Sequence, residues 1–291
     1  MRYRVSHNTT YSYEDFVSIS HNEARLTPRR TARQTATRTQ FLIEPAPAEL
    51  VTESDYFGNI VSFFSVEESH ARLAVTAVSE VDVSSDPPPD PSASPPWEVV
   101  RDAVHENRTL RGLEALGYTF ESPFVSTHAD LVAYARESFP AGRPTLEAAA
   151  ELTERIHADF RYEPGATSIA TPVTEVMRAR HGVCQDFAHL EIAMLRGLGL
   201  PVRYVSGYVH NRPKGAEPAL VGGDASHAWL AVYCGDTGYV DLDPTNGSLP
   251  TDEHVTLAWG RDFGDVSPLK GVILGGGRHS LAVNVGVAIA S

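Results

Sequence analysis

One of the two cysteines of this 291-residue chain lies where a helix is expected to begin. Gly182 precedes Cys184 by two residues, and apolar residues with helical spacing follow it at Phe187, Leu190, Met194, Leu195 and Leu198. The free backbone N–H groups and the positive dipole at the start of a helix favour a thiolate. The position therefore suits a nucleophile, although a lone cysteine at the start of a core helix is more often structural.

A base and an acceptor for that base are offered by two later strand-like runs. His227 opens the run 227–233, and Asp243 closes the run 238–243, directly before Pro244. If the two runs pair as an antiparallel hairpin, His227 and Asp243 become neighbours across the strands. Such a pair would take up and hold the proton of a cysteine nucleophile. Asp241 competes for the same role, because residues two apart face the same side of a strand. The position at the strand end, opposite His227, favours Asp243.

Four further residues are candidates for supporting this site. Asp186 falls in the first turn of the Cys184 helix, where capping of free N–H groups is favoured over a role in catalysis. Gln185 could line the site or face solvent. Tyr162 could donate its hydroxyl to an oxyanion, or it could simply pack. Trp229 shares the strand face of His227, and we expect it to shield the His–Asp pair.

A zinc site is the alternative chemistry for some of these residues. Cys184, His189, His227 and Cys234 could be arranged around an ion, but they contain no ligand pair with a short-loop spacing. Cys234 is an odd number of residues from His227 and so faces the opposite side of the strand. The glycines at 275–277 lack the Lys-Ser/Thr pair and the helix of a phosphate-binding loop. We therefore expect neither a metal nor a cofactor, and we expect His189 to be a helix-face residue.

Two kinds of structure are expected to position the site. Residues 1–83 contain several alternating runs, which predict an N-terminal all-β domain, sandwich-like or a curled sheet. Residues 84–97 hold six of the twenty prolines and predict a linker. Residues 98–291 predict helices up to the Cys184 helix, then strands at 202–209, 227–234, 239–243 and 280–290, with a polar loop at 209–223. The fold class is α+β.

The composition limits the partners of the chain. A net charge of −13 argues against nucleic acid as the main partner. Two cysteines cannot form a disulfide scaffold and suit a reducing compartment. The first 25 residues contain no apolar segment of signal-peptide type, and no later apolar run is long enough to span a bilayer. We expect a cytoplasmic protein without a membrane partner; the oligomeric state stays open.

The strip Arg25, Arg29, Arg30, Arg33 and Arg38 is expected to be a solvated strand face.

Four motifs in this chain resemble those of the bacterial transglutaminase-like proteins, a family often described as cysteine proteases. The motifs are Gly182-Val183-Cys184-Gln185-Asp186-Phe187-Ala188, Arg203-Tyr204-Val205-Ser206-Gly207-Tyr208, Ser226-His227-Ala228-Trp229 and Asp243-Pro244-Thr245-Asn246-Gly247. Residues 1–83 resemble the β domain that precedes the core in this family. The resemblance implies a papain-like or transglutaminase-like core, with helices packed on an antiparallel sheet. It also implies Cys184 as nucleophile, His227 as base and acid, and Asp243 as the residue that orients His227.

The reaction that these residues predict is acyl transfer through a thioester on Cys184. Attack on a peptide, isopeptide or other amide bond followed by water gives hydrolysis, which we favour because water needs no second pocket. An amine acceptor gives transamidation or amide ligation with the same triad. A non-catalytic binding or scaffold protein is the alternative from a different class.

Overall fold

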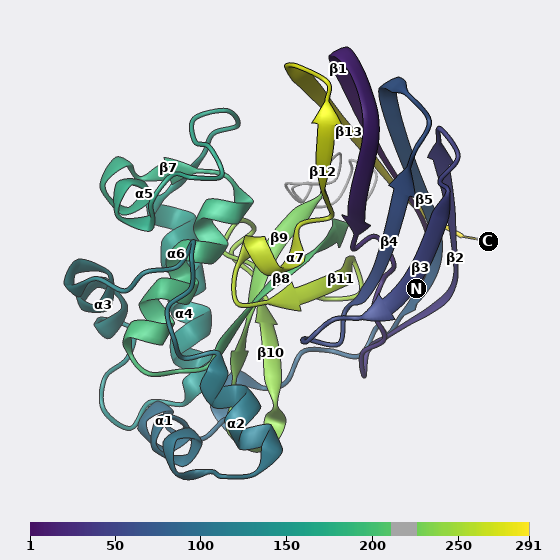
Figure 1. Ribbon diagram of the computed structural model, residues 1–291. Helices are drawn as coiled ribbons and strands as arrows, with labels where there is room; N and C mark the ends of the chain where they lie inside the picture. Colours follow the sequence, from purple (N-terminus) through teal and green to yellow (C-terminus); the bar gives the residue numbers. More distant parts are fainter. Residues whose placement is uncertain (211–225, 291) are drawn as a thin grey trace.

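The computed structural model describes residues 1–210 and 226–290 (Figure 1). They form a mixed α+β fold in which a small antiparallel sheet lies between a layer of helices and a larger, curved sheet. The predicted fold class is confirmed. The loop expected at 209–223 falls, from residue 211 onward, outside the described residues.

The larger sheet is organised around its first, very long strand. Its strands are β1 (Arg2–Ala24), β2 (Gln34–Glu44), β3 (Glu49–Ser54), β4 (Ile60–Val66) and β5 (His70–Val83), in the spatial order β2-β5-β1-β4-β3. The first half of β1 pairs with β5 and the second half with β4, and the register shifts between Ser12 and Val17. Phe64 of β4 and Val75 of β5 belong to one apolar cluster. The sheet thus curls over on itself and encloses a small core.

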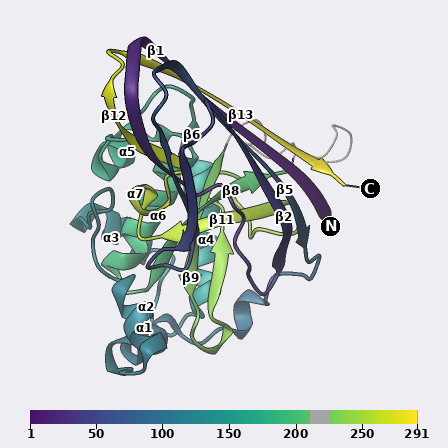
Figure 2. The same ribbon diagram turned by 45° about the vertical axis from the view of Figure 1, so that its right-hand side comes forward.

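Both ends of the chain contribute to this sheet. The strands β12 (Leu269–Gly275) and β13 (His279–Ile289) pair antiparallel with the second and first halves of β1 (Figure 2). The strand expected at 280–290 is therefore present, whereas β12 was not predicted. The division into domains at residues 84–97 stays a prediction. The predicted C-terminal part, residues 98–291, includes β12 and β13, and both strands lie in the sheet of the predicted N-terminal part.

The helices lie on one side of the smaller sheet. They are α1 (Trp97–Glu106), α2 (Leu110–Gly117), α3 (Ala129–Arg136), α4 (Thr145–Asp159), α5 (Val173–Ala179), α6 (Cys184–Gly197) and the short α7 (Phe263–Val266). α6 is central, and every residue from Asp186 to Arg196 is buried. It packs on β9 and β8, and α3, α4 and α5 pack around it (Figure 1). Among the described residues, no helix is long and apolar enough to cross a membrane.

The smaller sheet carries the residues of interest. Its strands are β8 (Val202–Val209), β9 (His227–Tyr233), β10 (Tyr239–Leu242) and β11 (His254–Gly260), in the order β10-β9-β8-β11. β8, β9, β10 and α6 occur where they were predicted, but β11 was not predicted. Two short strands, β6 (Arg161–Tyr162) and β7 (His181–Gly182), pair in parallel just before α6.

Trp259 of β11 joins the two sheets. The Arg29 guanidinium lies over the Trp259 ring, 3.2 Å from its centroid, and the Arg203 guanidinium lies 4.5 Å from it. The Asn59 side chain exchanges two hydrogen bonds of 2.9 Å with the backbone of Trp259. The expectation of a solvated arginine strip is wrong for Arg25 and Arg29. Both are buried, because Arg25 pairs with Glu23 and Asp55 while Arg29 stacks on Trp259.

Candidate active site

Cys184 is the first residue of α6 and is half-buried. The backbone of Val183 is extended, and its N–H donates to Oδ2 of Asp186 at 2.8 Å. The same oxygen accepts the hydroxyl of Thr167 at 2.6 Å. A Cβ on Gly182 would come within 2.8 Å of this carboxylate oxygen, so glycine is needed there. The capping interpretation of Asp186 is confirmed, and the cap fixes the start of the helix that presents the thiol.

Tyr162 lies beside the cysteine. In the short parallel β6–β7 ladder, Tyr162 is paired with Gly182, which is the residue directly before the helix cap Val183. Burial raises the pKa of the Tyr162 hydroxyl, and the nearby charge of Cys184 raises it further. The phenol is therefore a neutral hydrogen-bond donor next to Cys184, as an oxyanion partner would have to be. Gln185 is half-buried in the first turn of α6.

His227 and Asp243 meet, as predicted, but diagonally across the strands, because the register carries Asp243 opposite Trp229 and not opposite His227. β9 and β10 pair antiparallel, with Leu230 opposite Leu242. His227 opens β9, Asp243 directly follows β10, and the two side chains are joined by an Nε2–Oδ2 hydrogen bond of 2.8 Å. Both side chains have no exposed surface. The preference for Asp243 over Asp241 as the partner of His227 is thereby confirmed.

The Asp243 carboxylate is held in its ionised form by a set of donors. Burial alone would raise its pKa, but the charge and hydrogen bond of His227, followed by those of His254, bring it well below the usual range. Oδ1 accepts the backbone N–H groups of Thr245 and Asn246 at 3.0 and 3.2 Å. Oδ2 accepts the Asn246 side-chain amide at 2.7 Å. An ionised carboxylate only accepts, so the Nε2 atom of His227 must carry a proton.

The charge on Asp243 favours a protonated His227. Burial lowers the pKa of this imidazole, but the charge and hydrogen bond of Asp243, together with Cys184, outweigh burial and raise it to about 10. Because Nε2 is engaged by Asp243, Nδ1 is the ring nitrogen left for the thiol of Cys184. An imidazolium beside a thiol at a helix start stabilises the thiolate. The geometry thus places the imidazole of His227 beside the Cys184 side chain at the start of α6.

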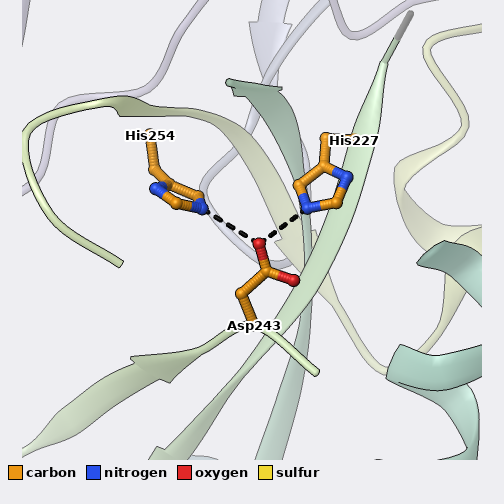
Figure 3. A group of neighbouring side chains, drawn as sticks. All are labelled: His227, Asp243 and His254. Carbon is orange, nitrogen blue, oxygen red and sulfur yellow. Dashed lines mark hydrogen bonds and ion pairs between the residues drawn. The ribbon is translucent and has the colours of Figure 1, made fainter. Parts of the chain in front are cut away.

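The sequence reasoning missed a third member of this cluster, His254. Its Nε2 atom lies 3.1 Å from Oδ2 of Asp243, the same oxygen that His227 contacts (Figure 3). His254 is the first residue of β11, which was not predicted as a strand. The β-prone run from His254 to Trp259 after a turn was the available signal.

Trp229 lies against both histidines. Its ring centroid is 6.0 Å from that of His227 and 5.3 Å from that of His254, and the side chain is fully buried. The ring passes over Gly207 of β8, where a Cβ would lie 2.4 Å from the indole. The expected shielding of the His–Asp pair by Trp229 agrees with this packing.

The four residues considered for zinc are not brought together as one set. His189 is buried, stacks on Phe124 with centroids 5.8 Å apart, and its Nε2 accepts the N–H of Phe263. Burial raises the pKa of the Cys234 thiol to about 12. Within the described part of the chain, the side chains grouped closely enough for a metal are His227, Asp243 and His254, whose ligand atoms lie within 4.8 Å of one another. Both imidazoles direct Nε2 at one ionised carboxylate oxygen, which is the arrangement of two N–H donors on an acceptor.

A cavity of about 450 Å³ lies between the large sheet and β9–β11. Its lining includes Arg33, Asp241 and His254, but neither Cys184 nor His227. Burial raises the pKa of Asp241 to about 6, and the electrostatic interaction with His254 opposes this shift. His254 therefore separates this cavity from the His227–Asp243 pair.

Comparison with known proteins places the chain in a family. Residues 3–82 match the bacterial transglutaminase-like N-terminal region, and residues 132–244 match the transglutaminase-like superfamily. An uncharacterised protein of Mycobacterium tuberculosis is 42% identical over 288 residues, which cover 96% of this chain and 90% of that protein. A solved structure from Cytophaga hutchinsonii, proposed to be a cysteine protease, has a TM-score of 0.77 at 21% identity and covers 99% of this chain and 90% of its own.

A more distant relative carries a functional name. It is a protein-glutamine gamma-glutamyltransferase of Pseudomonas aeruginosa, 29% identical over 133 residues, which cover 38% of this chain and 19% of that protein. The two family matches, the extensive identity to the mycobacterial protein and the shared fold agree with the motifs around Cys184, His227 and Asp243. This chain belongs to the bacterial transglutaminase-like family.

Proposed function

We propose that the protein is a thiol acyl-transfer enzyme that uses Cys184, His227 and Asp243 as a catalytic triad. The observation that carries the proposal is the fully buried hydrogen bond between His227 and Asp243, with the half-buried Cys184 at a helix start beside the imidazole. A nucleophile, a base and an orienting carboxylate in this order are what acyl transfer requires. The substrate class is a peptide, isopeptide or other amide.

The first half-reaction forms a thioester. The Cys184 thiolate attacks the carbonyl carbon, and the π electrons move to the oxygen, which becomes an oxyanion. The backbone N–H of Cys184 and the hydroxyl of Tyr162 are the proposed donors to that oxyanion. When the oxyanion collapses, the C–N bond breaks and the leaving amine takes the proton from Nδ1 of His227. The products are an acyl-thioester on Cys184, a free amine and a neutral imidazole.

The second half-reaction resolves the thioester. Neutral His227 takes a proton from water as the water oxygen attacks the carbonyl carbon. Breaking the C–S bond then releases a carboxylic acid and restores the thiolate–imidazolium pair. Water needs no binding pocket of its own, so hydrolysis is the favoured outcome. Transfer to an amine is the second candidate, supported by the name of the Pseudomonas aeruginosa relative.

Selective alkylation tests the nucleophile. Iodoacetamide at about pH 5.5 should label Cys184 rapidly, because a thiolate paired with an imidazolium persists below the pKa of a free thiol. Cys234 is an internal control, since burial raises the pKa of its thiol to about 12. If Cys184 reacts with the pH profile of an ordinary thiol, the proposal fails and a binding or scaffold role is favoured.

Intact-mass spectrometry of the protein with a peptide library tests the reaction. A mass increase that disappears in Cys184→Ala identifies the thioester. Loss of the adduct in water, without added amine, indicates hydrolysis. Amide products formed with added amine indicate transamidation. A Cys184→Ala variant that keeps full turnover on a substrate of the wild-type protein excludes the thioester mechanism.

A further inference from the structure

Asp243 is shared by two imidazole rings. Nε2 of His227 and Nε2 of His254 lie 2.8 and 3.1 Å from the same oxygen, Oδ2 (Figure 3). The two histidines come from β9 and β11, which are separated in the sheet by β8. A triad of the kind proposed above needs only one of these rings. The second imidazole is an addition for which that mechanism has no use.

The packing around His254 holds it in this position. Its side chain is 4% exposed, and its ring is in an edge-on contact with Trp229 at a centroid distance of 5.3 Å and an interplanar angle of 82°. Trp229 can reach it because Gly207, in the strand between them, has no side chain. β11 is fixed at this end by pairing of His254 with Val209. The ring is thus built into the sheet and directed at the carboxylate.

The two imidazoles share Oδ2 with the Asn246 amide, and donors on one carboxylate oxygen compete for its charge. Each N–H that Oδ2 accepts stabilises the anion and so reduces the strength with which the oxygen binds the other. The other groups around Asp243 are the same in every variant compared: Asn246 donates its amide to Oδ2, Glu191 of α6 interacts with the carboxylate, and Asp241 and Arg33 line the cavity beside His254. His254 should therefore weaken the hydrogen bond between Asp243 and the His227 imidazolium.

We propose that His254 is a positioning residue that acts through Asp243 to keep the His227 imidazolium acidic enough to protonate the leaving amine. A buried carboxylate paired only with His227 would stabilise the imidazolium so strongly that transfer of its proton from Nδ1 becomes slow. Sharing the carboxylate with His254 moderates this stabilisation while the carboxylate stays ionised and in place. The inference rests on the proposed function, because it assigns His254 a role in the same reaction.

Histidine-selective NMR titration measures the pKa of the His227 imidazole directly. The His227 ring signals are assigned by their loss in His227→Asn, and their titration is followed in the wild type and in variants at position 254. His254→Phe removes the donor with little change of shape, and we expect the His227 pKa to rise by about half a unit to one unit. His254→Gln, whose amide can still donate to Oδ2, should restore the wild-type value in large part.

Two controls separate this role from a structural one. His189→Phe removes another buried histidine that does not contact Asp243, and it should leave the His227 pKa unchanged. In the Asp243→Asn background, His254→Phe should also cause no shift, because the carboxylate through which His254 acts has gone. A shift of similar size in either control would overturn the proposal.

The results for His254→Phe, or for the wild-type protein if that variant does not fold, also decide whether the inference holds. A His227 pKa that is unchanged or lowered in His254→Phe overturns the inference, while a normal thiolate–imidazolium profile of Cys184 in the wild type leaves the proposed function intact. If His254→Phe does not fold, the wild-type protein still supplies a test. The Nε2 proton of His254 must appear as a protected, downfield N–H signal, and a ring protonated on Nδ1 alone contradicts the proposal.

Discussion

Nε2 of His227 lies 2.8 Å from Oδ2 of Asp243, and neither side chain is exposed to solvent. Because the carboxylate is ionised, this hydrogen bond fixes the proton on Nε2 and leaves Nδ1 as the ring nitrogen that is free to gain or lose a proton. The bond therefore determines both the charge and the direction of the imidazole. Replacing Asp243 by asparagine removes the carboxylate charge but keeps the shape of the side chain. This substitution therefore separates the electrostatic contribution of Asp243 from its orienting contribution.

Asp243→Asn should lower the pKa of His227, since Asp243 is the group that offsets the burial of the imidazole. The electrostatic support that the imidazolium would give a thiolate at Cys184 is then reduced. We expect alkylation of Cys184 at about pH 5.5 to slow by about tenfold or more, because each unit of pKa changes the thiolate fraction tenfold. Asp241→Asn is the matched control, two residues earlier on the same strand face. Equal slowing in both variants would show that the effect is not specific to the triad.

Gly207 should be intolerant of a side chain. A Cβ there would lie 2.1 Å from the carbonyl oxygen of Val255 and 2.4 Å from the Trp229 ring. Gly207→Ala should therefore lower the free energy of unfolding by about 1–3 kcal/mol, because neither the strand backbone nor the fully buried indole can move freely. Gly286→Ala in β13 is the control, since its Cβ meets no atom within 4 Å. Urea denaturation should find Gly286→Ala close to wild type, and equal losses would contradict this account.

The hairpin that joins His227 to Asp243 could be predicted because the residues that specify it lie close together in the sequence. β9 and β10 are short, adjacent in the chain and ended by turn residues, so the period of two places their end residues together. His254 could not be found in this way. Its approach to Asp243 depends on the pairing of β11 with β8 and on a loop that carries the chain from β10 across to β11.

The strands that were missed share a physical cause. β12 is exposed at most of its positions and β11 is buried at nearly all of its positions, so neither shows the alternation that identifies a strand. The arginine strip was misinterpreted because the partners of Arg29, such as Trp259, are remote in sequence. Local patterns thus located Cys184, His227 and Asp243. The contact of His254 with Asp243 depends on tertiary structure.

The cap at the start of α6 should matter for stability. Asp186→Ala removes the acceptor of the Val183 N–H and of the Thr167 hydroxyl, and it leaves a donor unpaired at the helix start. We expect the free energy of unfolding to fall by about 1–2 kcal/mol, with faster amide exchange in the first turn of α6. Thr167→Val removes only one of the two donors and should cost less. A larger loss in Thr167→Val than in Asp186→Ala would show that the cap is not the stabilising contact.

Glu191 should make the stability of the protein depend on pH. This side chain of α6 is completely buried, its Oε1 accepts the hydroxyl of Thr153 at 2.8 Å, and burial raises its pKa to about 8. The folded state therefore keeps the proton between about pH 4.5 and 8, whereas the unfolded chain loses it. Glutamine cannot titrate, so Glu191→Gln should remove this contribution.

The sign follows from proton linkage. Where the folded state binds more protons than the unfolded state, the free energy of unfolding falls as the pH rises, here by at most about 1.4 kcal/mol per pH unit. Urea denaturation should therefore find Glu191→Gln similar to wild type near pH 5 and more stable by about 2–4 kcal/mol near pH 8. Glu154→Gln, an exposed position on α4, is the matched control and should follow the wild-type profile. Parallel pH profiles for Glu191→Gln and the wild type would mean that Glu191 is ionised in the folded protein.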